Sequence, residues 1–198
     1  MTNQILGHMA HPSDPCEYLT LSFSPFSAPI RSRWRNNGVS ADFLGDYVIT
    51  FLPGSGRVAS DHNEIKHAVT YIANELLENA MKYRETGVDI PIGLHMELTS
   101  DQITVSATNG AGFEQAQRYR DFVECILGGD AAELLVKQLE QGAANGGSNK
   151  SCLGLLTMIN DFQVQLGCRF EVHAAYAQTV NVTTSVVLPL KNLSGVTA

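Results

Sequence analysis

An amphipathic segment at residues 61–84 constrains the fold more than any other feature of the chain. Its apolar side chains recur at helical spacing: Ile65, Val69, Ile72, Leu76 and Tyr83. This stripe predicts a long helix that buries one face. Asp61 followed by Glu64 resembles a capping box, and Gly87 and Pro91 end the pattern. The helix therefore needs an apolar partner surface, which the rest of the chain must supply.

The segments around this helix show alternating strand and helix character. Strands are predicted at 17–23, 92–99, 102–108, 161–166, 169–175 and 179–189. Residues 40–52 are predicted to be helical or mixed, and helices are predicted at 113–127, 131–141 and 153–160. Ser100-Asp101 joins a hairpin, while 109–112 and 142–150 are expected to be flexible. This order predicts an α+β fold, a two-layer α/β sandwich with helices on one face of a mixed, mostly antiparallel sheet.

Length and composition fit one domain. With 198 residues and 44% hydrophobic residues, we expect a single domain at 16–190, with tails at 1–15 and 191–198. The net charge of −7 argues against a nucleic-acid binder. No apolar stretch approaches the length of a membrane span, and the first residues do not form a signal peptide. A cytoplasmic protein with four reduced, scattered cysteines is the resulting expectation.

Three polar residues of the long helix form a candidate site. Glu75, Asn79 and Lys82 share one face, on the shoulder of the apolar stripe. A carboxylate and an amide oxygen four residues apart suit Mg²⁺, and the carboxylate can also accept a proton. Glu78 and Lys82 form the i, i+4 pair common on solvated helices, so the same residues also suit an ordinary helix surface.

The run Glu75-x-x-x-Asn79-Ala80-x-Lys82 resembles the N-box of the GHKL, or Bergerat-fold, ATP-binding proteins. This family includes histidine kinases, gyrase-type ATPases, heat-shock-type chaperones and anti-sigma-factor serine kinases. The resemblance implies that Asn79 binds Mg²⁺ bridging the phosphates of ATP. It implies that Glu75 acts as the base and that Lys82 approaches the phosphates. It covers about residues 60–190.

Two further motifs of that family follow in altered form. Asp-x-Gly-x-Gly corresponds to Thr108-Asn109-Gly110-Ala111-Gly112, with Thr108 in place of the aspartate that binds the adenine amino group. The glycine-rich turn before a helix corresponds to Lys150-Ser151-Cys152-Leu153-Gly154-Leu155. The resemblance implies cofactor contacts by these two segments: Thr108, Asn109, Gly110, Gly112, Lys150, Leu153 and Gly154. Backbone amides at a helix start can hold phosphate even where glycines are missing.

The size of the chain narrows the implied function. About 60 residues precede the helix that carries the N-box-like run, and they hold no coiled coil with a phospho-acceptor histidine. The chain therefore resembles the stand-alone anti-sigma and SiaB-type serine/threonine kinases, which act on a small partner protein of STAS type or similar. Many stand-alone members dimerise, so a homodimer is compatible with this branch. The alternative is a pseudokinase that keeps the fold as a protein-binding module. A small-molecule hydrolase is a third, less favoured class.

Overall fold

The computed structural model describes residues 3–9, 17–24, 30–52, 59–144 and 153–190. Their helices and strands follow in the order β1 (Gln4–Gly7), β2 (Glu17–Phe23), α1 (Ile30–Phe51), α2 (Ala59–Lys82), β3 (Ile92–Leu98), β4 (Gln102–Gly112), α3 (Phe113–Gly128), α4 (Ala131–Ala144), α5 (Leu153–Phe162), β5 (Gln165–Val172) and β6 (Thr179–Pro189). Within these ranges, no helix is long and apolar enough to cross a membrane.

The strands of the described ranges form one sheet in the order β1-β5-β6-β4-β3-β2. Every neighbouring pair is antiparallel, and β4 and β6 pair along their full length at the centre. The predicted α+β sandwich is thus confirmed. The expected mixed sheet is corrected to a wholly antiparallel one: β4 and β5 run in the same direction, but β6 lies between them and is antiparallel to both.

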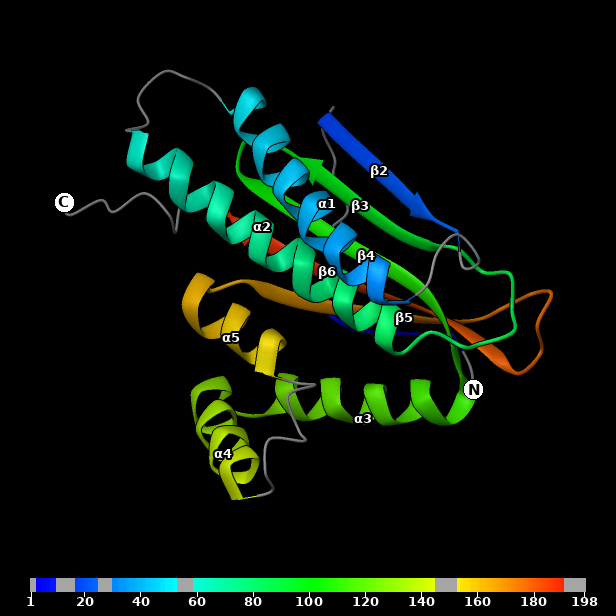
Figure 1. The fold of residues 1–198 in the computed structure, drawn as a ribbon. Helices are drawn as coiled ribbons and strands as arrows, with labels where there is room; N and C mark the ends of the chain where they lie inside the picture. The colour runs from blue at the N-terminus through cyan, green and yellow to red at the C-terminus, as the bar shows by residue number, and fades with distance from the viewer. Residues whose placement is uncertain (1–2, 10–16, 25–29, 53–58, 145–152, 191–198) are drawn as a thin grey trace.

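One face of the sheet is covered by helices (Figure 1). α1 packs against α2, α2 lies over β3 and β4, and α3 contacts β4, β6, β5 and β1. α5 lies beside α2, and α4 packs on α5 at the outside of this layer. Along β3, every second residue is buried against this layer: Ile92, Leu94, Met96 and Leu98. This alternation is the period of two that one buried sheet face requires.

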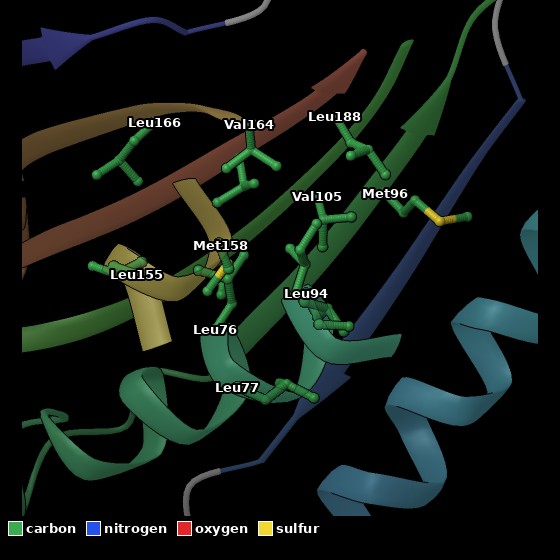
Figure 2. Close-up of a cluster of buried hydrophobic side chains, with 14 of the residues drawn as sticks. Leu76, Leu77, Leu94, Met96, Val105, Leu155, Met158, Val164, Leu166 and Leu188 are labelled. Atoms are coloured by element: carbon green, nitrogen blue, oxygen red, sulfur yellow. The ribbon is translucent and has the colours of Figure 1, made fainter. Parts of the chain in front are cut away.

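The core lies between α2, α5 and the sheet (Figure 2). Leu76 and Leu77 of α2, together with Leu155 and Met158 of α5, are at most 2% exposed. They face β-strand side chains such as Leu94, which is equally buried. The apolar stripe predicted for the long helix is therefore the surface that positions α2 on the sheet.

Several predicted boundaries change. α1 begins at Ile30 rather than at 40, and β1 lies within the expected tail at 1–15. Residues 109–112, expected to be a turn, are the end of β4, and they pair with β6 up to Gly112 opposite Thr179. The two strands expected at 161–166 and 169–175 are one strand, β5, preceded by α5. The expected tail at 191–198 lies outside the described residues.

Candidate functional site

A narrow cavity lies between α2, α3 and the sheet, at the position of the predicted site. From α2 it is lined by Leu76, Asn79, Ala80 and Tyr83. The other walls come from β4, α3 and β6: Ala107, Asn109, Ala111, Gln115, Ala116, Tyr119, Val182 and Thr184. Its volume is about 20 Å³. This is room for about one water molecule.

Asn79 is half-buried at the wall of this cavity. Among the described residues, its side-chain amide has no hydrogen-bond partner, whereas its backbone carbonyl accepts from the amide of Tyr83 at 3.0 Å. Asn109 faces it from β4, and its side-chain nitrogen lies 3.5 Å from the Tyr83 carbonyl oxygen. An amide oxygen without a partner beside a cavity is a suitable ligand for a hard cation.

Glu75 is in direct contact with the start of α5. A Cβ atom added to Gly154 would lie 2.7 Å from Cδ of Glu75, closer than real Cβ atoms approach, and 3.1 Å from its Cγ, which is a tight contact. Gly154 is itself buried. The fold thus brings together the acid of the first motif and the glycine of the third, which are 79 residues apart in the sequence. Any larger residue at 154 would displace the Glu75 side chain.

The contact leaves Glu75 poorly hydrated. Burial raises the pKa of its carboxyl, and the charge of Glu78 raises it further. Burial also raises the pKa of Tyr71, one turn earlier on α2, and the charge of Glu75 adds to that shift. Glu78 differs from Glu75 because it accepts a hydrogen bond from the Asn74 side-chain amide at 3.0 Å. A carboxylate with a raised pKa is a stronger base than an ordinary glutamate.

The raised pKa of Glu75 gives a prediction about stability. Ionising Glu75 costs more in the folded chain than in the unfolded chain, so its contribution to stability falls as pH rises through its folded-state pKa. We expect Glu75→Gln to raise the melting temperature near pH 7 by on the order of 1–3 °C, because Glu75 is only half-buried and water screens part of the cost. Thermal unfolding at several pH values measures this.

Two features of that experiment make it decisive. The gain from Glu75→Gln should shrink towards pH 4, where the carboxyl is protonated in both states. Glu114→Gln on α3 is the matched control, because the Glu114 side chain is 88% exposed and, among the described residues, pairs with Arg118. A gain that stays constant with pH, or that Glu114→Gln reproduces, would refute the explanation by burial.

Of the predicted site residues, Glu75, Lys82 and Leu153 do not line the cavity at Asn79. Lys82 is exposed, and its Nζ lies 5.2 Å from the centre of the Tyr83 ring. Leu153, the first residue of α5, is half-buried. Lys150, predicted to add a positive charge here, lies outside the described residues. Lys82 therefore places a positive charge next to Tyr83, which forms part of the cavity wall.

The position of Thr108 corrects the prediction made for it. Its hydroxyl lies 2.9 Å from that of Thr183, on the face of the sheet away from the helices. The neighbouring residues Ala107 and Asn109 line the cavity instead. Because successive side chains of a strand point to opposite faces, β4 cannot direct Thr108 and Asn109 into the same cavity. Asn109, not Thr108, is the polar side chain that this strand offers to the site.

Gly110 and Gly112 allow other segments to approach β4 closely. A Cβ at Gly110 would lie 2.7 Å from Cδ1 of Ile90, and one at Gly112 would collide with the Glu85 carboxylate. Gly112 belongs to a second, wide groove of about 910 Å³, formed with Glu85, Glu114 and the β5–β6 connection. Glu85 and Glu114 make this groove unfavourable for phosphates, although Arg118 also lines it. Gln115 lines both cavities and so lies between them.

Sequence reasoning missed an aromatic residue that lines the cavity, Tyr119 of α3. Its ring stacks on Tyr83 at 6.5 Å between centres, and its hydroxyl lies 2.9 Å from that of Thr184. The thiol of Cys168 lies 4.0 Å from the same hydroxyl, and burial raises the pKa of that thiol to about 11. The available signal was the helical spacing of Ala116, Tyr119 and Val123, which places Tyr119 on the inner face of α3.

A protein-only metal site is not found in the part of the chain that the structure describes. There, no three His, Cys, Asp or Glu side chains gather as metal ligands do. Mg²⁺ bound with a nucleotide does not require such a cluster, because waters and phosphates supply most of its ligands. The donor set at Asn79 therefore fits Mg²⁺ carried by a polyphosphate.

The comparisons with known proteins assign no function to this chain. No family model and no curated protein matches this chain. The assignment therefore depends on the motif residues and on the contacts that the fold creates between them.

Proposed function

We propose that this protein is an ATP- and Mg²⁺-dependent regulator of the GHKL type, kinase-like towards Ser or Thr of a small partner protein. One observation carries the proposal. Glu75 of the N-box-like segment lies against Gly154, the glycine that opens the helix of the third motif. In the family that the sequence resembles, these two motifs surround the phosphates, and a chance amphipathic helix has no reason to bring them together.

The cavity beside Glu75 supports the same assignment. Asn79 lines it with an amide that has no partner among the described residues, and Lys82 lies next to Tyr83 at its edge. Asn79 would hold Mg²⁺, and Lys82 would approach the phosphates. The bound metal would offset charge on the phosphoryl group during transfer. Glu75, with its raised pKa, would accept the proton of the partner's hydroxyl.

Room for the nucleotide requires α3 to move. A cavity of about 20 Å³ does not admit an adenine ring. Tyr119 and Gln115 occupy the space beside Asn79, and both belong to α3. We therefore infer that ATP binds a form in which α3 is displaced from α2. The affinity measured in solution is then lower than the affinity of that form, in proportion to the fraction of molecules that adopt it.

A second function, a pseudokinase that binds a partner protein, is favoured by two observations. The cavity is closed by Tyr119, whose hydroxyl bonds to Thr184. Thr108, the counterpart of the family's adenine-binding aspartate, lies on the other face of the sheet. Under this alternative, α3 stays in place and the surface of the fold, not the nucleotide, carries the function.

Calorimetric titration with ATP separates the two candidates. For the kinase-like function, we expect micromolar binding that requires Mg²⁺ and weakens by at least about 30-fold in Asn79→Ala, which corresponds to about 2 kcal/mol. Asn74→Ala is the matched control, because Asn74 is the same residue type on the same helix but bonds to Glu78. It should bind ATP as the wild type does.

The other outcomes are equally informative. No binding up to millimolar ATP would favour the pseudokinase, and a pull-down would then replace the phosphorylation assay. Binding that Asn79→Ala and Asn74→Ala weaken equally would contradict the placement of the metal on Asn79.

A further inference from the structure

A third pocket, lined mainly by polar side chains, lies on the face of the sheet opposite the helices. It has a volume of about 160 Å³ and is enclosed by strands β3 to β6 and by the segment that includes Ile5 and Met9. The chain approaches the sheet closely here, because a Cβ at Gly167 would lie 3.0 Å from the sulfur of Met9 and would collide with the His8 carbonyl. No residue that lines this pocket also lines the cavity at Asn79.

The floor of this pocket is a set of hydroxyl groups. Ser185 is 2% exposed, Thr104 is 7% exposed, and Ser106, two residues after Thr104 on β4, is paired with Ser185 of β6. In the described part of the chain, these three hydroxyls have no hydrogen-bond partner, unlike that of Thr183, which bonds to Thr108. Three neighbouring donors that face a pocket without partners are suited to an acceptor-rich ligand.

Arg169 adds a positive charge, which is ion-paired with Glu171, and a donor atom, Nε, that makes no hydrogen bond. Its Nε atom is buried and makes no hydrogen bond, although it lies 3.3 Å from a carboxylate oxygen of Glu171. A buried N–H group without a hydrogen bond is uncommon because its desolvation is costly. An acceptor in the pocket would relieve that cost. The guanidinium also presents further N–H donors in a plane that matches oxyanions.

The acidic group of the pocket is already engaged. Glu97 accepts a hydrogen bond from Nε2 of His95 at 2.9 Å, and Nδ1 of His95 lies 2.8 Å from the Thr20 hydroxyl. Since the carboxylate can only accept, Nε2 must donate, and Thr20 then donates to Nδ1 when the ring is neutral. This chain fixes both side chains in the sheet and directs the Glu97 charge towards His95.

We propose that this pocket binds a small oxyanion, a phosphate or a short carboxylate, through Arg169 and the hydroxyls of Thr104, Ser106 and Ser185. The volume and the apolar walls of Ile5 and Met9 restrict the ligand to that size. The chain as a whole has a net charge of −7 and does not attract anions. Binding would therefore arise from this pocket, and it is independent of the nucleotide function proposed above.

NMR titration of the intact chain with inorganic phosphate, and separately with acetate, tests this proposal. We expect saturable shifts of the backbone amides of Thr104, Ser106 and Ser185 with either anion. Arg169→Gln and Ser185→Ala should each weaken the affinity by at least about tenfold. Arg118→Gln, whose side chain is 79% exposed on α3, should leave it unchanged. The wild-type shifts locate the anion even if a variant fails to fold.

Three results would overturn the proposal. The first is the absence of saturable shifts with both anions. The second is an affinity that Arg169→Gln and Ser185→Ala leave unchanged. The third is binding that disappears in Asn79→Ala, because the anion would then lie at the proposed nucleotide site. That third result would leave the nucleotide proposal intact, so the two proposals can fail separately.

Discussion

Replacing Tyr119 with alanine is expected to lower the free energy of unfolding by about 2–4 kcal/mol, because the ring fills the space between α2, α3 and the sheet. The ring stacks on Tyr83 and lies 6.3 Å from the centre of the Phe170 ring. Tyr119→Phe should cost only about 1 kcal/mol, since it removes the hydrogen bond to Thr184 and keeps the ring. Urea unfolding of both variants measures the difference.

Tyr119→Ala should also tighten the binding of Mg·ATP. Removing the ring takes away its contact with Tyr83, which holds α3 against α2, so a larger fraction of molecules adopts the form in which α3 is displaced. Tyr119→Phe should not produce this gain, because the ring still fills the cavity. A stability loss in Tyr119→Ala with no gain in ATP affinity would mean that Tyr119 is a core residue and that α3 does not close a nucleotide site.

The second large effect is expected at Gly154. Gly154→Ala should destabilise the fold by about 1–3 kcal/mol, because its Cβ would overlap the Glu75 side chain. In a Glu75→Ala background the same change should be neutral or should stabilise by up to about 1 kcal/mol, since alanine is the better helix former. Urea unfolding of the four chains of this cycle gives the coupling between the two residues.

A matched glycine makes the Gly154 result specific. A Cβ at Gly38 in α1 would meet no atom within 4 Å, so Gly38→Ala should gain the helix propensity without a clash. Its effect should be the same with or without Glu75. If Gly154→Ala cost the same in both backgrounds, Glu75 would not be in contact with the start of α5. The observation that carries the proposed function would then fail.

The features that follow from periodicity could be predicted from the sequence. The stripe from Ile65 to Leu76 places α2 on the sheet, and these side chains are at most 1% exposed. The alternation around Val105 gives the β3–β4 hairpin. Both signals are local, because each depends on which face of one element is buried. They were sufficient to predict a two-layer α+β sandwich.

Elements held by distant partners could not be predicted. β1 has only four residues, and it is a strand because Gln4 to Gly7 pair with β5 at the edge of the sheet. The two strands expected at 161–166 and 169–175 are one strand because β5 stays paired with β6 through Gly167, opposite Ser185. Gly110 permits the approach of Ile90 inside β4 instead of forming a turn.

The candidate site was predictable only in part, because contacts between distant segments also form it. Glu75 and Asn79 share a helix face by spacing alone, and the cavity lies where that face meets the sheet. The assignment of Thr108 followed the order of letters in a motif, and the pleat of β4 turns that residue to the other face. Tyr119 enters the site from α3, and only the packing of α3 on the sheet reveals it.

Hydrogen–deuterium exchange with and without Mg·ATP tests the central claim most directly, because it locates the ligand along the chain. We expect Mg·ATP to slow exchange at the C-terminal half of α2 around Asn79 and at the start of α5 around Gly154, and Asn79→Ala to abolish this protection. Protection confined to the wide groove at Gly112 and the β5–β6 connection, or no protection at any ATP concentration, would contradict a nucleotide site between α2 and α3.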